Sequence, residues 1–361
     1  MTMPSSGVLN AAATSSPISV AYELALGLTT TISMNDAAVR TLAGVGATGT
    51  QWSMSSLYGQ TAVSGIFMLG YGGGATINTS NILTPRGVFG SDINYAVGTV
   101  TPRYSALSAN YGTNKGIFSY GANSIAPTFY TNRISSKAVV AADIVTAGTA
   151  REQGAGTSFG SSEQAIYAFG GNDSGSSTAY FNVSNIISSA GVVAADTTGV
   201  GTARWGVAAC RYGSSGAALC AYGRINFLNA LSTQNPISTT GVVSGDAAGV
   251  GTARADLAAV EYGGDKGIFG YGTSATGVYH SLTNLMSNTG VIATDTAGVG
   301  TARSGLAACK YGTNTAVFVF GYNGSVYTSN ANYVSSTGVV AADVATSMAT
   351  RTDASAAALF S

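Results

Sequence analysis

The chain has few charged residues. Only 8% of its 361 residues are Asp, Glu, Lys or Arg, and 15 basic side chains balance 15 acidic ones, whereas about 25% charged residues is usual in a soluble domain. Without an excess of either sign, the protein has no field that would attract a phosphate backbone or an anionic lipid surface. We therefore expect no nucleic-acid partner and no membrane insertion.

Long apolar runs are also missing. No stretch approaches the roughly 20 apolar residues of a membrane helix, and the first residues, MTMPSSGVLN, lack the basic residues and apolar core of a signal peptide. The expectation is a protein that is made in a cytosol and stays there until something carries it out.

Histidine and cysteine are scarce. His280 is the only histidine, so a Ser-His-Asp triad would have to be built around it, and metal sites with several histidines are excluded. The three cysteines include Cys210 and Cys309, which stand at the same place in two repeats and indicate small core residues rather than a disulfide. We predict no metal, no cofactor and no enzymatic activity. Hydrolysis of a glycan by paired carboxylates is the alternative.

The chain does have a repeat. Copies of GVGTARSGLAACKYG, residues 298–312, recur at intervals of about fifty residues, a period that fits the blades of a β-propeller. Thr101-Pro102-Arg103 is a looser first copy. Glycine, with 49 residues, supplies the many sharp turns that such a chain needs. The other copies centre on Thr-Ala-Arg or a close variant, with their arginines at Arg151, Arg204, Arg254, Arg303 and Arg351.

Each repeat reads as four short strands. In the last complete repeat they are predicted at 306–311, 316–320, 326–334 and 338–343, which makes one four-stranded antiparallel blade. The first strand has small residues, as a crowded innermost strand requires. The second carries alternating aromatics such as Phe318 and Phe320, which would stack on the neighbouring blade.

The number of blades follows from the aromatic second strand, which occurs six times. The chain ends in a first strand, 354–360, that no second strand follows, whereas the second strand at Gly65 lacks a first strand of its own. Pairing these two would close a six-bladed ring and leave no free edge. A seven-bladed ring that uses N-terminal strands is the alternative.

The order of these features resembles the kelch repeat: an arginine after a turn, a small-residue strand, an aromatic strand that ends in glycine, and two further strands. The resemblance covers roughly residues 60–361, although Tyr-Gly or Phe-Gly mostly replaces the usual Gly-Gly pair. It implies an all-β fold, a six-bladed kelch-like β-propeller of four-stranded antiparallel blades over residues 61–361, closed by the C-terminal strand.

Each repeat also places an aspartate eight residues before its arginine. One interpretation is a ring of binding sites. The other, which we favour because the pattern is identical in each blade, is a structural brace in which the carboxylate accepts backbone N–H groups or the arginine fork. The pairs are Asp143 and Arg151, Asp196 and Arg204, Asp246 and Arg254, Asp295 and Arg303, and Asp343 and Arg351, with Asp92 and Arg103 at a wider spacing.

Residues 1–60 follow a different pattern, with apolar residues at helical spacing and capping residues at Ser19 and Ser33. Two helices this short are marginal alone and need a surface on which to pack. We predict a helical docking module that uses Val20, Leu24, Leu28, Val39, Arg40 and Leu42.

This segment resembles a short module of tail and fibre proteins of tailed bacteriophages, above all in SMNDAAVRTLAG, residues 33–44. The resemblance implies a structural virion protein of a tail fibre or of the tail and baseplate, made in the bacterial host cytoplasm. Its partners would be other tail proteins and, as a homo-oligomer, further copies of itself. A spacer or decoration protein that binds no host molecule is the alternative, beside the glycan-degrading enzyme.

The repeats differ most in the link between the second and third strands. Variable loops on a rigid ring are where recognition usually occurs, and aromatic side chains there suit a protein or sugar partner on the host surface. For Tyr130, Tyr180 and Tyr327 the alternative is that they begin the third strand and pack inside the blade. The candidate receptor contacts are Phe129, Arg224, Phe227, Tyr279 and His280.

Overall fold

A computed structural model describes Val39 and residues 63–359, apart from residues 97, 113, 124–125, 162, 174–177 and 275–276. This part of the chain is all-β and consists of small antiparallel sheets. Among the described residues there is no helix of the length and apolar character that a membrane crossing requires.

Six main sheets succeed one another along the chain, and each contains an inner, a second and a third strand. The first is β24 (Ser355–Ala358), β1 (Gly65–Met68), β4 (Thr79–Leu83) and β5 (Ile93–Asn94), and the second is β6 (Leu107–Tyr111), β7 (Lys115–Ser119), β8 (Tyr130–Ile134) and β9 (Ile144–Val145). The third is β10 (Ala155–Phe159), β11 (Gln164–Asp173) and β12 (Thr178–Ile187), and the fourth is β13 (Ala208–Tyr212), β14 (Ala217–Ala221) and β17 (Gln234–Ile237). The fifth is β18 (Ala258–Tyr262), β19 (Lys266–Gly270) and β20 (Thr283–Met286), and the sixth is β21 (Ala307–Tyr311), β22 (Thr315–Val319) and β23 (Ala331–Val334). Two small hairpins extend from these sheets, β2 (Tyr71–Gly72) with β3 (Ala75–Thr76), and β15 (Arg224–Asn226) with β16 (Asn229–Ala230).

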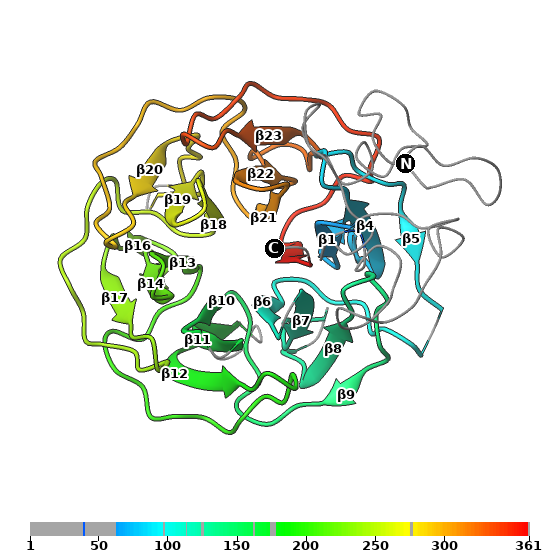
Figure 1. Ribbon diagram of the computed structural model, residues 1–361, viewed down its shortest axis with the longest axis horizontal. Coiled ribbons are helices and arrows are strands. Elements are labelled where there is room, and N and C mark those ends of the chain that lie inside the picture. Colours follow the sequence, from blue (N-terminus) through cyan, green and yellow to red (C-terminus); the bar gives the residue numbers. More distant parts are fainter. Residues whose placement is uncertain are drawn as a thin grey trace.

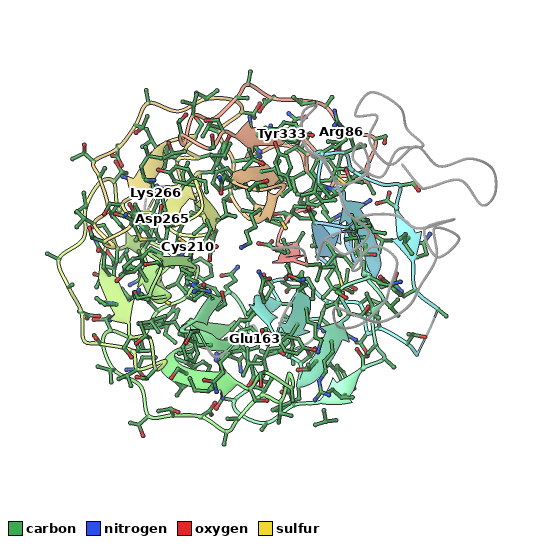
Figure 2. All side chains as sticks on the ribbon, viewed as in Figure 1. Arg86, Glu163, Cys210, Asp265, Lys266 and Tyr333 are labelled. Atoms are coloured by element: carbon green, nitrogen blue, oxygen red, sulfur yellow. The ribbon has the colours of Figure 1, made fainter. Side chains whose placement is uncertain are left out.

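The six main sheets lie in a ring around a central axis (Figure 1). The inner strands contact one another in the cyclic order β6, β10, β13, β18, β21 and β24. Their side chains are mainly small, Ala, Gly, Ser and Cys, as strands that converge on one axis require. Larger side chains, those of Arg211, Glu261 and Lys310, line a central channel at the axis. Cys210 on β13 lies toward this axis in Figure 2 and is a buried free thiol, as are Cys220 and Cys309.

The two ends of the described chain meet in the first sheet. There β24 lies antiparallel to β1, with Gly65 opposite Ala358 and Met68 opposite Ser355. On the outer side of the same seam, the Tyr333 hydroxyl donates a 2.8 Å hydrogen bond to the Gly87 carbonyl, beside Arg86 (Figure 2). The last repeat therefore completes the first sheet and joins the sixth sheet to it.

The fourth strand differs from the sequence expectation. In the sixth sheet, the segment expected at 338–343 pairs with β23 only through isolated bridges, Val334 to Val340 and Ala331 to Val344. The two bridged residues are three positions apart on β23 but four positions apart on the outer segment. The outer segment therefore has one extra residue and is bowed. The Asn332 side chain donates to the Ala341 carbonyl at 3.0 Å within this bowed stretch, and the equivalent asparagine of every other sheet makes the same bond. The third, fourth and fifth sheets have the same two bridges, and only the first two have a short fourth strand.

The second strands supply the apolar contacts between neighbouring sheets. Each is buried along most of its length, and at four of the six junctions an aromatic ring lies against a ring of the neighbouring sheet, with centroids 5.3–6.0 Å apart. The stacking between sheets agrees with the prediction, but the two alternating aromatics of the sixth sheet face opposite neighbours, Phe318 the fifth sheet and Phe320 the first, because Phe320 has a positive φ of 67°. The pairs are Phe67 with Phe320, Tyr120 with Tyr167, Tyr222 with Phe269, and Tyr271 with Phe318.

The predicted docking module lies almost entirely outside the described residues. Val20, Leu24, Leu28, Arg40 and Leu42 are among those not described. Val39 alone is described, with helical backbone and a side chain that is 2% exposed.

Candidate functional site

Each repeat contains a closed circuit of hydrogen bonds around its buried arginine. In one of them, Arg151 donates to the Asn185 side-chain oxygen at 2.7 Å and to the Thr149 carbonyl at 3.1 Å. The Asn185 amide donates to Asp196 at 2.8 Å, and Asp196 accepts the Thr149 hydroxyl at 2.6 Å and its backbone N–H at 2.9 Å. Arg151 also donates to the Phe169 carbonyl at 2.7 Å. We call this circuit the brace.

The brace corrects the pairing of aspartate with arginine. Asp196 faces Arg151, which begins its own sheet, and not Arg204 eight residues downstream, because the outer segment that carries the aspartate returns to the start of that sheet. Asp92 likewise pairs with Arg351 across the seam, not with Arg103. The remaining pairs are Arg103 with Asp143, Arg204 with Asp246, Arg254 with Asp295, and Arg303 with Asp343.

The arginines are completely buried, and most of them stack on an aromatic ring. Their guanidinium carbons lie 4.2–4.8 Å from ring centroids of the preceding sheet. Arg103 is the exception, because in the sheet that precedes it Leu69 stands where the other sheets have the stacked aromatic residue. Burial lowers the pKa of Arg103 to about 10, and the nearby Asp143 opposes this shift. The arginine side chain thus joins two neighbouring sheets and satisfies polar groups in its own sheet.

The brace predicts a specific loss of stability in acid. Burial alone would raise the pKa of the carboxyls at Asp196, Asp246, Asp295 and Asp343, but bonds from threonine, asparagine and arginine outweigh it and lower the pKa. The folded protein then binds fewer protons than the unfolded chain, so this stabilisation is complete above the ordinary aspartate pKa of about 3.9 and is lost as pH falls through the lower folded value. We expect the free energy of unfolding, measured with denaturant, to fall steeply below about pH 4, and Asp295→Asn to reduce that slope. An unchanged slope would contradict the assignment.

The start of each inner strand forms a second cyclic network at the axis. The residue two positions after each repeat arginine has positive φ, between 52° and 65°, and its backbone N–H donates to the equivalent carbonyl of the preceding sheet at 2.7–3.1 Å. Six such bonds close a circle around the axis, which we call the axial ring. Its members are Ser105, Gln153, Gly206, Asp256, Gly305 and Asp353.

Two carboxylates of the axial ring have unusual surroundings. Asp256 accepts Arg224 through one oxygen, while its other oxygen is buried and has no partner among the described residues. Burial raises the pKa of Asp353 to about 7, and the negative charges of Asp256 and Glu152 add to the rise. The axial ring lines a shallow hollow together with the residues that follow it in the inner strands.

Aromatic side chains surround this hollow on the same end of the ring, where each second strand ends and each inner strand begins. We call this end the loop face. Backbone bridges such as Tyr71 with Thr352 and Tyr104 with Ala122 tie these positions to the axial ring. Five partly exposed tyrosines form a continuous arc in which neighbouring ring centroids are 5.2–6.0 Å apart, in the order Tyr104, Tyr71, Tyr327, Tyr322 and Tyr279.

A second aromatic group lies on the third and fourth sheets. Trp205, which is 3% exposed, contacts Tyr180 and Phe227 with ring centroids 5.6 and 5.4 Å away. Its indole nitrogen has no hydrogen-bond partner among the described residues. Phe227 is 57% exposed at the tip of the β15–β16 hairpin, beside Leu228, which is 74% exposed.

The structure places the predicted receptor contacts in separate groups. Phe227 joins the Trp205 group, and Arg224 links that group to the axial ring through Asp256. Tyr279 lies at the end of the tyrosine arc, and burial raises its pKa. Its neighbour His280 has a pKa lowered by burial. Phe129 is 51% exposed and forms no ring contact with another described aromatic residue.

Of the three tyrosines for which a place at the start of the third strand was the alternative, Tyr130 and Tyr180 lie there, in β8 and β12, and Tyr327 does not. Tyr180 and Tyr327 are partly buried by contacts with Trp205 and with other tyrosines, whereas Tyr130 starts β8 and is 36% exposed.

Sequence reasoning missed the residues directly after each repeat arginine. These are Tyr104, Glu152, Trp205, Ala255, Ser304 and Thr352, and they differ in every repeat although the arginine does not change. Sequence reasoning also missed Tyr71 and Tyr322. They follow the glycine that ends the second strand, and the residue at this position also varies between repeats. A comparison of the repeats at these two positions would have found the loop face.

The residues described by the structure include no group of three or more His, Cys, Asp or Glu side chains placed to hold a metal ion. Comparison with known proteins adds no assignment, since no protein-family model matches the chain and no curated protein is significantly similar to it.

Proposed function

We propose that the chain is a non-enzymatic structural component of a bacteriophage virion, in a tail fibre or in the tail and baseplate, and that its β-domain is a six-bladed kelch-like propeller. The fifty-residue repeat, the ring of six main sheets and the strand pairing at the seam support the propeller (Figure 1). The resemblance of residues 33–44 to a phage tail module supports the virion.

The propeller contacts the host surface through its loop face. The observation that carries this role is a contrast within one ring: the brace is repeated in all six sheets, while the side chains of the loop face change from sheet to sheet and include two aromatic groups. A rigid ring with variable aromatic residues at one end suits recognition of a protein or a glycan.

The first 60 residues dock the propeller on another tail protein or on a second copy of the chain. The apolar side chains at Val20, Leu24 and Leu28 recur at helical spacing, and a short amphipathic helix gains most of its stability from packing. Docking at one end leaves the loop face free for the host.

We expect Phe227→Ala combined with His280→Ala to weaken adsorption of particles to host cells several-fold without reducing the amount of protein in the particle. A hot-spot aromatic typically contributes about 2 kcal/mol or more to an interface. Val339→Ala, which alters a residue that is 66% exposed at the start of the outer segment of the sixth sheet, is the control. Normal adsorption of the double variant would favour a spacer over a receptor-binding protein.

One observation favours the alternative of a glycan-degrading enzyme. Asp353, with a pKa of about 7, lies near Asp256, and a carboxyl that holds its proton beside an ionised one is the arrangement of glycosidases. Release of reducing ends from host polysaccharide by the wild-type protein, abolished in Asp353→Asn, would establish this activity and overturn the non-enzymatic proposal.

A further inference from the structure

The axial ring places several hydrogen-bond acceptors on one small circle. Asp256 and Asp353 are separated in the ring by Gly305 alone, because Gly305 donates its N–H to the Asp256 carbonyl and Asp353 donates to that of Gly305. A Cβ on Gly305 would lie 2.8 Å from Asp353 Oδ1, and one on Gly206 would lie 2.5 Å from Asp256 Oδ1. Each carboxylate therefore leans over a glycine of the preceding sheet.

Ser105 extends this acceptor set. It has the same φ as Asp353, 52°, and donates the same kind of backbone bond, to the Asp353 carbonyl. Ser105 and Asp353 are therefore direct neighbours in the axial ring. Ser105 is 8% exposed and lines the axial hollow, and its hydroxyl has no partner among the described residues. A buried hydroxyl without a partner is costly unless a ligand or water satisfies it.

The charges around the hollow are unbalanced. Asp256, Asp353 and Glu152 are the acidic groups that act on one another there, and Arg224 is the cation that acts on both aspartates. Arg224 is already bound to one oxygen of Asp256. The other Asp256 oxygen and the Ser105 hydroxyl have no partner among the described residues, and the Asp353 carboxylate accepts a hydrogen bond from the Thr352 side chain. Together they call for a ligand that brings further donors and positive charge. A primary ammonium group has three donors, one positive charge and no acceptor.

We propose that the axial hollow binds a primary ammonium group carried by a surface glycan, as in an amino sugar with a free amine. The inference rests on the proposed recognition role of the loop face and names the chemistry that this face recognises. The tyrosine arc beside the hollow, with Tyr71 and Tyr104 bridged to the strands that enter the axial ring, offers faces for the sugar rings. A metal ion fits less well, because the described residues contain no metal-binding group of acidic side chains.

The test is titration of the purified full chain with ethanolamine, followed by NMR at pH 8. Ethylene glycol is the matched neutral probe, and tetramethylammonium carries charge without donors. We expect ethanolamine to bind about tenfold or more tightly than either, because a hydrogen bond between charged partners is lost in both controls. Equal binding of ethylene glycol, or stronger binding of calcium at the same resonances, would overturn the proposal.

Variants locate the site. Asp353→Asn and Ser105→Ala should each weaken ethanolamine binding, the first by about tenfold, and lowering the pH from 8 to 5 should weaken wild-type binding because Asp353 becomes protonated. Asp265→Asn is the control, since Asp265 lies in the turn between β18 and β19 at the other end of the ring, paired with Lys266 (Figure 2). Binding that survives Asp353→Asn unchanged would contradict the assignment.

Larger probes identify the source of the amine. We expect a deacetylated glucosamine oligomer to bind more tightly than its N-acetylated form and than a trilysine peptide, and preference for the peptide would overturn the glycan assignment. Failure of all amines, with adsorption still dependent on Phe227, would refute the ammonium site and leave the recognition role standing. Amine binding, together with adsorption that no substitution in the loop face alters, would support the ammonium site and refute the recognition role.

Discussion

Replacing Arg254 with methionine is expected to lower the midpoint of thermal unfolding by about 10 °C, since breaking a buried ion pair costs roughly 3 kcal/mol or more. Arg254 is completely buried, donates to Asn284 at 2.5 Å and lies 3.6 Å from Asp295. Methionine keeps the apolar stem but leaves the Asn284 oxygen and the Tyr271 carbonyl without their donor. Differential scanning calorimetry measures the effect.

Arg211→Met is the matched control for this experiment. Arg211 lies on β13 and is partly exposed at the central channel, outside the brace. Its replacement should change the midpoint by little, because exposed charges contribute about 1 kcal/mol or less. Equal midpoints for the two variants would show that the brace does not hold the sheets together.

Deletion of residues 353–361 is expected to abolish cooperative unfolding and to reduce solubility. The deletion removes β24, which pairs with β1 through four residues and contacts β21 and β6, and it also opens the axial ring at Asp353. The exposed edge of β1 would then be free to pair with other molecules. Circular dichroism during heating, together with the soluble fraction after expression, measures the result.

A point substitution tests the same closure in a chain of full length. Ala357 is 2% exposed and packs between the first and second sheets. The space is tight, because a Cβ added to Gly116 would lie 2.7 Å from the Cβ of Ala357. Ala357→Asp should therefore destabilise the protein strongly, whereas Ala356→Asp, on the partly exposed side of the same strand, should cost much less. If both the deletion and Ala357→Asp melt like the wild type, the ring does not depend on its C-terminal strand.

The sequence was informative wherever the repeats agree. The recurring arginine, the aromatic second strand and the small inner strand each predicted a feature of the main sheets, and two incomplete repeats indicated the pairing of β24 with β1. The asparagine of the brace was missed although it too recurs, eleven residues before each aspartate. Agreement between repeats reveals local packing because each repeat meets the same neighbours.

Contacts between repeats were harder to predict. Asp92 binds Arg351 across the seam, and the tyrosine arc joins Tyr71 near the start of the described chain to Tyr327 near its end. Such pairs depend on how the sheets close around the axis, which no spacing within one repeat encodes. The fourth strand was overestimated because its β-like composition does not show that its ladder is interrupted by the bowed stretch opposite β23.

The central claim is that this chain is a tail component whose loop face points outward. It is tested most directly by electron microscopy of intact particles purified from the host of origin, with a gold label attached at Ser325, in an exposed loop of that face. The account predicts label on the tail or its fibres, on the side away from the particle axis. Particles without label, or label on the head or buried against the tail, would contradict it.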